Sequence, residues 1–450
     1  MSLRFIFPFI QYVRPLWYFN HSSKRNIWID YNCLSDEDKM LIDYDENYSS
    51  KNVSLLDAAY QILLKGIALN TVHKELNIES VIIDVNDNYR FIRKYFHHFW
   101  SLYVLLLRLL TLHSPHKELK AFYLSLRIKR KNVYERHKEY ESFKDYNSPL
   151  IKRNPKVSVI IPTLNRYEVL SDVLHDLEKQ DYKNFEVLVV DQSDEFRKEY
   201  YEGYKLNIKV YYLTVKGVWN ARNYAIRKSV GEFIALSEDD VRIKPDWISS
   251  HLKTLCFFGA EISAGVFFPE GSFVPFEKSY HRIAEQFATG NAVLYKKVFK
   301  ITGLFDEQFE MQRMGDGEFG LRAYINGIIS INNPIAYCID IKAASGGFRE
   351  FGYWDAFRAK KLFAPKPVPS VLYLARKYFG NKQALKYLLL NVAPSVVPYK
   401  YKSYKYVGII SLLFFVLLIP ILFIQVVSSW MKATKMIKEG YKIEYFDQNE

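Results

Sequence analysis

The chain has 450 residues, of which 49% are apolar, 16% aromatic and 25% charged. This balance is that of a globular protein and excludes a wholly disordered or collagen-like chain. With 62 Lys and Arg against 49 Asp and Glu, the formal net charge is +13, which favours anionic partners such as phosphates or an anionic membrane face. The three cysteines, Cys33, Cys256 and Cys338, are scattered and show no CxxC spacing. Neither a disulfide framework nor a zinc site is expected, and reducing, cytosolic surroundings are the simplest interpretation.

Residues 1–150 are expected to form an accessory region of mixed α/β structure, whose role the sequence does not indicate. Strand-like runs occur at 26–31 (NIWIDY) and 80–85 (SVIIDV), and a helix-like run occupies 55–68. Short runs rich in β-branched and aromatic residues are typical of strands, whereas longer runs with apolar residues three and four apart are typical of helices.

A second helical pattern, at 91–113, is strongly apolar on one face. Arg108 splits its apolar run, so the segment is too short to span a bilayer and is expected to lie on a membrane surface or to pack against a domain. The charged stretch 126–144 is expected to form a solvated helix. Asn, Ser and Pro cluster at 145–154, which predicts a linker.

From residue 155 onward, strands are expected to alternate with helices. Continuous apolar runs are typical of strands that are buried on both faces. Such runs occur at 157–162, 185–191, 209–215 and 232–240, with helical patterns at 168–179 and from about Val218. This alternation predicts a parallel α/β sheet, in which ligands bind at the carboxyl ends of the strands.

Polar side chains follow three of these strand ends. They lie at Pro162–Asn165, at Asp191–Asp194 and at Glu238–Asp240. A single acid at a strand end is usually a cap or turn former, but three adjacent carboxylates repel one another. A hard divalent cation relieves that repulsion, and Mg²⁺ typically takes one or two carboxylates plus phosphate oxygens. The last cluster therefore predicts a metal and phosphate site.

The C-terminal region contains a long uncharged segment from Tyr406 to Val427. As a helix it would measure about 33 Å, enough for a hydrocarbon core, so residues 406–428 are expected to form a transmembrane or membrane-associated helix. Pro420 leaves a re-entrant or monotopic hairpin possible, and lysines on both flanks leave the orientation undecided. The preceding residues 351–405 are expected to be helical, and 429–450 to be a polar tail.

Six segments occur in an order and at a spacing that resemble a family 2 glycosyltransferase of the GT-A fold. They are VSVIIPTLNR (157–166), VLVVDQSD (187–194), KGVWNARNYAI (216–226), GEFIALSEDDV (231–241), TGNAVLYKKVFKITGLFDEQF (289–309) and GDGEFGLRAYINGI (315–328). The resemblance covers about residues 155–350 and says nothing direct about residues 1–150. It implies a GT-A (nucleotide-diphospho-sugar transferase, Rossmann-like) domain there.

The resemblance also implies a nucleotide-sugar site, position by position. Thr163 and Asn165 would line the base and ribose, and Asp191 would bond the base edge. The other residues implied on this side of the site are Pro162, Ser193, Arg222, Glu238, Asp239 and Arg322.

A metal site is implied at the strand end that carries the three acids. The segment Glu238–Asp240 resembles the family's DxD motif, with Glu in the first place. Asp240 would bind Mg²⁺ or Mn²⁺, and Asp239 the ribose or sugar. Asp340 holds the place at which relatives have a His near the metal, and its carboxylate can also be a ligand. Gly346, Gly347 and Arg349 are expected to form a loop that closes on the diphosphate.

The catalytic base is implied at Asp316. The family's Glu-Asp motif ends in an Arg six residues after the Asp, and Arg322 holds that place. Gly315 stands where the family often has Glu, and Glu318 is the alternative base. The non-catalytic interpretation is that both acids complement the dipole at the start of a helix.

These assignments predict a metal-dependent, inverting transfer of a sugar from a nucleotide-sugar donor to an acceptor hydroxyl. A tethered active site fits a saccharide or lipid-linked saccharide acceptor in surface polysaccharide or glycan biosynthesis. The expected location is membrane-associated, with a cytoplasmic catalytic domain.

Two other functions remain open. One is a catalytically degenerate, membrane-anchored nucleotide-binding scaffold, because Gly315 and Asp340 depart from the family pattern. The other is a nucleotidyltransferase, which would be expected to carry a Gly-rich phosphate loop after the first strand; the segment IPTLNRYE has none. Nucleic acid is not expected as a partner, since no recognised motif accompanies the basic charge.

Overall fold

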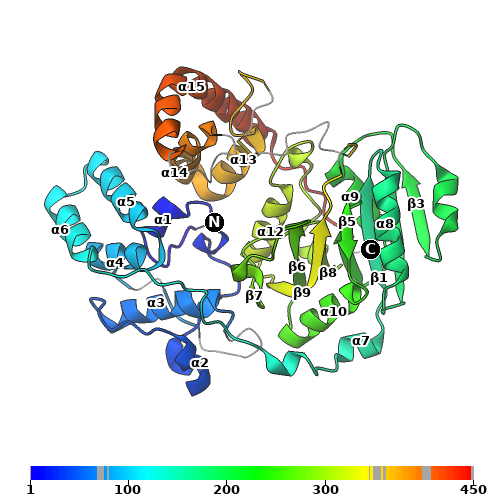
Figure 1. Cartoon of the computed structure of the whole chain (residues 1–450), viewed down its shortest axis with the longest axis horizontal. Helices are drawn as coiled ribbons and strands as arrows, with labels where there is room; N and C mark the ends of the chain where they lie inside the picture. The colour runs from blue at the N-terminus through cyan, green and yellow to red at the C-terminus, as the bar shows by residue number, and fades with distance from the viewer. Residues whose placement is uncertain are drawn as a thin grey trace. The chain divides into compact units, whose positions relative to one another are not determined.

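The computed structural model describes residues 2–67, 75–78, 81–343, 345–347, 356–357, 361–397 and 407–446, the last range with side chains from residue 415 onward. The chain divides into two compact units. The first is Met1–Asp145 together with Pro275–Glu285, and the second is Tyr146–Val274 together with Gln286–Glu450. Figure 1 shows the elements of both.

The first unit is mainly helical. Its helices are α1 (Ile10–Val13), α2 (Asp36–Leu41), α3 (Lys51–Leu64), α4 (Val85–Tyr95), α5 (His98–Leu110) and α6 (Pro115–Ser125). Helix α3 is almost wholly buried, and the Ser50 side chain caps it by accepting from the Val53 backbone N–H. Aromatic rings form much of the core, with Phe7 stacked on Phe91 at a centroid distance of 4.0 Å.

The strands expected in the first unit are not formed. Within the described parts of residues 2–145, β pairing is limited to two isolated bridges, Leu3–His21 and Ile29–Glu75. Residues 81–84 are irregular because Asp84 instead caps α4, accepting from the Asp87 N–H at 2.8 Å; residues 79 and 80 lie outside the description. The expected α/β accessory region is therefore corrected to a helical one.

Two helix predictions for this unit are also corrected. The pattern at 91–113 is divided between α4 and α5, because the His97 side chain accepts from the Phe99 N–H and starts a new helix. The charged stretch 126–144 is irregular apart from a short 3-10 turn. Its backbone is bonded to distant groups, with Lys131 N–H donating to the Lys94 carbonyl and Lys138 N–H to the Lys65 carbonyl.

The second unit is built on a mixed sheet in the order β3-β2-β1-β4-β8-β6-β9-β5. Its strands are β1 (Val157–Thr163), β2 (Phe185–Asp191), β3 (Ile208–Tyr212), β4 (Phe233–Ser237), β5 (Val241–Ile243), β6 (Ile262–Pro269), β8 (Asn291–Tyr295) and β9 (Ser330–Asp340). The predicted parallel part is confirmed, since β1 pairs in parallel with β2 and β4, and β2 with β3. Strand β8 then runs antiparallel to both β4 and β6.

Helices connect these strands and carry the residues of the site. They are α7 (Pro149–Arg153), α8 (Tyr167–Glu178), α9 (Val218–Lys228), α10 (Trp247–Phe258), α11 (Val298–Thr302) and α12 (Gly315–Ile325). All seven residues of β1 are buried, as expected for the central strand of a sheet covered on both faces. Its register with β2 pairs Thr163 with Asp191, so the polar ends of the two strands lie side by side.

The C-terminal region is helical, with α13 (Pro369–Leu374), a π-helical turn (Ala375–Phe379), α14 (Gly380–Asn391) and α15 (Val407–Glu439). Helix α15 contains Pro420 and continues past the expected end at residue 428 to Glu439. It does so because its later turns pack on the domain, where Ala433 and Met436 are buried. Its part Phe415–Glu439 is long and apolar enough to cross a membrane, by length and composition.

The expected polar tail does not project from the domain. After α15 the chain returns to the sheet unit, where the Leu304 N–H donates to the Glu444 carbonyl at 2.8 Å. The Lys442 N–H donates to the Asp306 carboxylate at 2.9 Å. These bonds fix the segment after α15 to the sheet domain.

Candidate functional site

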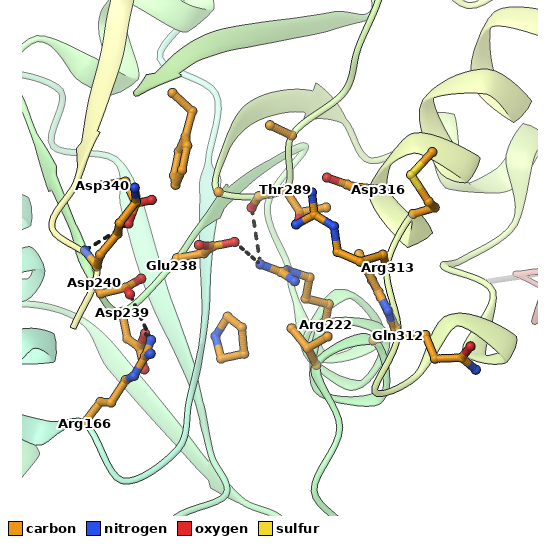
Figure 2. A pocket seen from close by; sticks show the side chains of 18 residues that line it. Arg166, Arg222, Glu238, Asp239, Asp240, Thr289, Gln312, Arg313, Asp316 and Asp340 are labelled. Carbon is orange, nitrogen blue, oxygen red and sulfur yellow. Dashed lines mark hydrogen bonds and ion pairs between the residues drawn. The ribbon is translucent and has the colours of Figure 1, made fainter. Parts of the chain in front are cut away.

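A cavity of about 680 Å³ opens at the carboxyl ends of β1 and β4. Strands β1, β6 and β9, the segment after β4, helices α9 and α12 and the loops before β8 and α12 contribute its walls. Figure 2 shows an acidic side with Asp239, Asp240 and Asp340, faced across the cavity by Asp316. The cavity therefore brings together carboxylates from three separate segments of the sequence.

The acidic side is organised around an arginine. Arg166 Nη1 lies 3.1 Å from Asp239 Oδ1 and 3.0 Å from Asp240 Oδ2. The Thr163 hydroxyl donates to Asp239 Oδ2 at 2.8 Å. Burial raises the pKa of Asp239 to about 6, with Arg166 opposing the shift and Asp240 adding to it. One guanidinium thus holds two carboxylates that would otherwise repel each other.

Asp340 joins this side through the sheet. It pairs with Val241 in the β5–β9 ladder, and the next residue, Ile341, donates its N–H to the Asp240 carbonyl at 3.0 Å. The Lys342 N–H donates to Asp340 Oδ1 at 3.0 Å. The two expected metal ligands, Asp240 and Asp340, therefore lie on neighbouring strand ends and line the same cavity.

Arg222 is a second cation on the cavity wall. Its side chain is buried, with Nη2 at 3.4 Å from Glu238 Oε1 and 3.5 Å from the Thr289 carbonyl. Burial lowers its pKa, against the opposing charges of Glu238 and Asp316. Within the described structure, Nε of both Arg222 and Arg166 is buried without a hydrogen-bond partner. These donors suit an anionic ligand with several acceptor oxygens.

The start of α9 is capped from a distant loop. The Glu310 carboxylate accepts from the N–H groups of Val218, Trp219 and Asn220 at 2.7, 3.0 and 3.1 Å. Burial raises the pKa of Glu310, and these backbone donors oppose the shift. The contact fixes the loop that leads to α12 against the helix that carries Arg222.

Asp316 lies in the first turn of α12 and is half-buried on the cavity wall. Its Oδ1 accepts from the Gly317 N–H at 2.7 Å. Gly315 packs under Trp219, and a Cβ there would lie only 2.4 Å from the indole ring. The glycine that departs from the family pattern is therefore required by packing.

Glu318 and Arg322, expected at the site, are not among the residues that line the cavity. Glu318 is fully buried and pairs with Arg322 at 2.9 and 3.0 Å. It also accepts from the Tyr378 hydroxyl, while Arg322 donates to the carbonyls of Thr302, Gly303 and Leu304. This is a correction of both assignments, because the spacing of four residues turns the two side chains toward each other inside the domain.

The residues expected around the nucleotide lie at the ends of β1 and β2. Pro162 lines the cavity. The Asn165 N–H donates to the Ser193 hydroxyl at 2.8 Å, which links the two strand ends. Asp191 is buried and accepts from the hydroxyls of Tyr167 and Tyr201 at 2.7 and 2.8 Å. Asp191 Oδ1 also accepts from the Ser193 N–H at 2.9 Å, so both carboxylate oxygens already have partners.

The glycine loop lies against Arg166. Gly347 has a φ of 76°, and a Cβ added there would lie 2.3 Å from the Arg166 guanidinium carbon. Its N–H donates to the Leu164 carbonyl at 2.8 Å. Arg349, expected in the same loop, lies outside the described residues.

The donor set fits a divalent cation only with help from a substrate. Among the described residues, no group of three or more His, Cys, Asp or Glu side chains is placed to hold a metal ion. Asp240 and Asp340 supply carboxylate oxygens at one edge, which suits Mg²⁺ or Mn²⁺ bound by one or two carboxylates plus phosphate oxygens. A cage made entirely by the protein does not fit.

Several cavity residues were not predicted. Arg166 and Trp219 lie inside two of the six motifs. The sequence therefore marked their segments, but it did not indicate what these two residues do. Thr289 is the first residue of another of the motifs, and its backbone carbonyl accepts from Arg222. Gln312 and Arg313 lie in the loop before α12, where no periodicity or motif marks them.

Residues 158–323 match the family described as glycosyl transferase family 2. The poly(ribitol-phosphate) beta-N-acetylglucosaminyltransferase TarS of Staphylococcus aureus (strain MW2) is 30% identical over 204 residues, covering 40% of this chain and 35% of TarS. The GalNAc(5)-diNAcBac-PP-undecaprenol beta-1,3-glucosyltransferase of Campylobacter jejuni subsp. jejuni serotype O:2 is 29% identical over 119 residues, covering 25% of this chain and 37% of that protein. The chain thus spans about a third of the length of these curated relatives.

Among solved structures, S. aureus TarS 1–349 in complex with UDP-GlcNAc is similar with 22% identity and a TM-score of 0.35, covering 52% of this chain and 66% of that chain. The family match confirms the resemblance that the six motifs predicted. The chain is thus similar to glycosyl transferase family 2 over residues 158–323.

Proposed function

We propose that this protein transfers a sugar from a nucleotide-sugar donor to a hydroxyl of a saccharide acceptor. One observation carries the proposal: a single cavity holds two buried arginines, an acidic strand end and, across from it, the carboxylate of Asp316. Cations suit a diphosphate leaving group, and a separate carboxylate suits proton removal from the acceptor. The names of the two relatives, an N-acetylglucosaminyltransferase and a glucosyltransferase, support the same class of reaction.

The donor diphosphate would be bound by Arg166 and Arg222. Each has a buried Nε without a hydrogen-bond partner in the described structure, whereas Nη1 of Arg166 already contacts Asp239 and Asp240, and Nη2 of Arg222 contacts Glu238. A diphosphate offers acceptor oxygens for such donors. The base and ribose would lie toward the ends of β1 and β2, beside Pro162.

Asp240 and Asp340 would hold Mg²⁺ or Mn²⁺ together with the diphosphate. When bound, such a cation neutralises charge that develops on the leaving diphosphate. Arg166 now sits between Asp239 and Asp240, so its guanidinium supplies the positive charge at this edge in the ligand-free protein.

Asp316 would act as the general base. Its carboxylate would accept the proton of the acceptor hydroxyl while that oxygen bonds to the anomeric carbon and the bond from this carbon to the diphosphate oxygen breaks. Because Asp316 faces the acidic edge across the cavity, attack and departure would occur on opposite faces of the sugar. This arrangement supports inversion of configuration.

The acceptor is proposed to be a saccharide carried on a lipid. A C-terminal helix long and apolar enough to cross a membrane supports an enzyme that works at a membrane surface. The Campylobacter relative, whose name describes an undecaprenol-linked saccharide, supports an acceptor of this class. The cytoplasmic face is proposed as the location, since nucleotide sugars and reduced cysteines both fit it.

The test is a comparison of Asp316→Asn with Asp36→Asn in full-length, detergent-extracted protein. Asp36 is an exposed acid in the first turn of α2, so the control repeats the chemical change at a similar helical position. Donor hydrolysis and transfer would be measured with UDP-, GDP- and dTDP-sugars in Mg²⁺ or Mn²⁺. We expect Asp316→Asn to reduce transfer by at least 10³-fold with donor affinity unchanged. Retained transfer would overturn the assignment of the base.

The same assay decides between an enzyme and a degenerate scaffold. Nucleotide binding without turnover by the unmodified protein, over all donors and with lipid-linked acceptors supplied, would favour the scaffold. Metal-dependent turnover that is lost in Asp240→Asn would support the transferase and its proposed cation site.

A further inference from the structure

We propose that α15 is a monotopic membrane anchor, which enters one leaflet of an anionic bilayer from the side of the second unit and does not cross. This inference deepens the proposed membrane association and rests on it, whereas it does not depend on the transfer reaction. It concerns the chain's path before and within α15.

One lysine joins the two ends of this path. The Lys366 N–H donates to the Gln425 carbonyl at 3.2 Å, and Lys366 Nζ donates to the Ser395 carbonyl at 3.1 Å. Gln425 Nε2 also donates to the Leu362 carbonyl at 2.6 Å. The chain therefore leaves the domain at Ser395 and has returned to the same place by Gln425. Any membrane insertion by the residues between them must begin and end on one side.

The sequence between Val397 and Val407 is too short and too charged to span a bilayer. Residues 398–406 read PYKYKSYKY. As a helix, nine residues would reach about 14 Å, against a hydrocarbon core of about 30 Å. As an extended chain they could reach about 30 Å, but three lysines would then lie in hydrocarbon, which is costly. Alternating Tyr and Lys is typical of the membrane–water interface.

The returning part is also short for a span. From Val407 to Ile424, α15 rises about 27 Å, slightly less than a hydrocarbon core of about 30 Å. Its following turns are held by the domain. Arg376 Nη1 donates to the Trp430 carbonyl at 3.0 Å and to the Thr434 hydroxyl at 2.7 Å. Figure 1 shows α15 beside α13, on which it packs.

The part of α15 that leaves the domain presents apolar side chains outward. Exposed residues there are Val416, Leu417, Ile419, Phe423 and Ile424, and nearby loop and helix residues Leu362, Phe363, Leu385 and Leu389 are exposed as well. Such a surface requires an apolar partner.

Charge identifies that partner as an anionic bilayer. Residues 356–438 contain fourteen Lys and Arg and no Asp or Glu. Two copies of so basic a segment would repel each other, whereas anionic headgroups attract it, each basic side chain contributing when it lies close to the membrane. Apolar insertion with a basic surround is the pattern of in-plane membrane helices.

The first test is flotation of full-length protein with vesicles of phosphatidylglycerol and phosphatidylcholine, compared with phosphatidylcholine alone. Leu417→Glu is matched with Phe273→Glu, since both side chains are strongly exposed, at 75% and 93%, and only the first lies on α15. We expect Leu417→Glu to reduce flotation at least tenfold and Phe273→Glu to leave it unchanged. Equal flotation of both variants, or a stable dimer without lipid, would overturn the proposal.

The second test determines on which side the flanks of α15 lie. Ser403→Cys and Lys438→Cys are each made in a Cys33→Ser, Cys256→Ser background, and an impermeant maleimide is added to bacterial spheroplasts before and after permeabilisation. A monotopic anchor predicts that both positions are labelled only after permeabilisation. Labelling of one position in intact spheroplasts would show a crossing and refute the monotopic arrangement while leaving membrane association intact. Absence from the membrane fraction would refute both, and transfer assays with soluble acceptors would remain a separate test of the enzyme.

Discussion

Removing Arg322 tests whether this residue supports the domain or binds the donor. In the structure, Arg322 neutralises Glu318, which is fully buried, and its guanidinium also donates to three backbone carbonyls at the end of α11. Burial by itself would lower the pKa of Arg322, but the charge of Glu318 outweighs this effect and the pKa is raised. Arg322→Met would leave a buried carboxylate without its main partner.

The expected loss follows from that stranded charge. Breaking a buried ion pair by removing one partner costs about 3–5 kcal/mol. The second unit has roughly 300 residues, so its unfolding entropy is about 0.6 kcal/mol/K and Tm should fall by about 5–8 °C. The second substitution Glu318→Gln should restore at least half of the loss, because a neutral amide needs no counter-charge and its oxygen can still accept from Tyr378.

The assay is thermal unfolding of the full chain, followed by near-ultraviolet circular dichroism, with donor affinity measured on the same samples at 10 °C. Support for a structural role is a lower Tm with donor affinity unchanged and partial recovery in the double variant. A Tm within 2 °C of the parent, combined with a tenfold weaker donor affinity, would refute the reasoning and return Arg322 to the donor site.

Three further predictions follow from contacts near the cavity and in the core. Gly347→Ala should weaken donor binding at least tenfold, since the new Cβ displaces Arg166, whereas Gly203→Ala, with open space around it, should not; calorimetric titration checks both. Burial lowers the pKa of His251 to about 4, so its neutral form contributes stability that is complete above pH 6.5 and is lost as the pH falls toward 4; urea midpoints should fall over this range, and less steeply in His251→Gln. Glu310→Ala should lower kcat more than donor affinity, because the start of α9 and the loop before Asp316 lose their shared anchor; steady-state kinetics would contradict this if only KM changed.

The parallel half of the sheet could be predicted because its strands are buried on both faces. Strands β1, β2 and β4 are apolar runs that are each followed by polar residues, a pattern that the sequence alone displays. Strand β9 could not be predicted in the same way. It contains Asn332, Asn333 and Pro334, and Asn333 is tolerated only because Ser250 and Ser263 accept its amide protons. Such a strand depends on partners that are distant in the sequence.

The candidate site, like the sheet, could be predicted only in part. The acids after β4 could be predicted because they follow an apolar strand, and Asp316 was implied by the family resemblance. The pairing of Arg166 with Asp239 and Asp240 could not, because it joins residues more than seventy positions apart. Glu318 and Arg322 show the opposite error, because a motif suggested that they act at the site. They are four residues apart and enclose the apolar residues Phe319 and Leu321, a pattern that also fits an ion pair inside the core.

The cap that Glu310 places on α9 has a consequence for product release. A helix N-terminus is a common phosphate-binding device, but here its backbone donors are already bonded to a carboxylate of the same chain. In the proposed reaction, the leaving diphosphate would therefore not be held by this helix start, and Arg166 and Arg222, which would bind it, have carboxylates of their own to return to. Each turnover then exchanges one set of ion pairs for another, so the spent nucleotide can depart without leaving bare charge behind. An enzyme built in this way would bind its product weakly and would be slowed little by the nucleotide that accumulates around it.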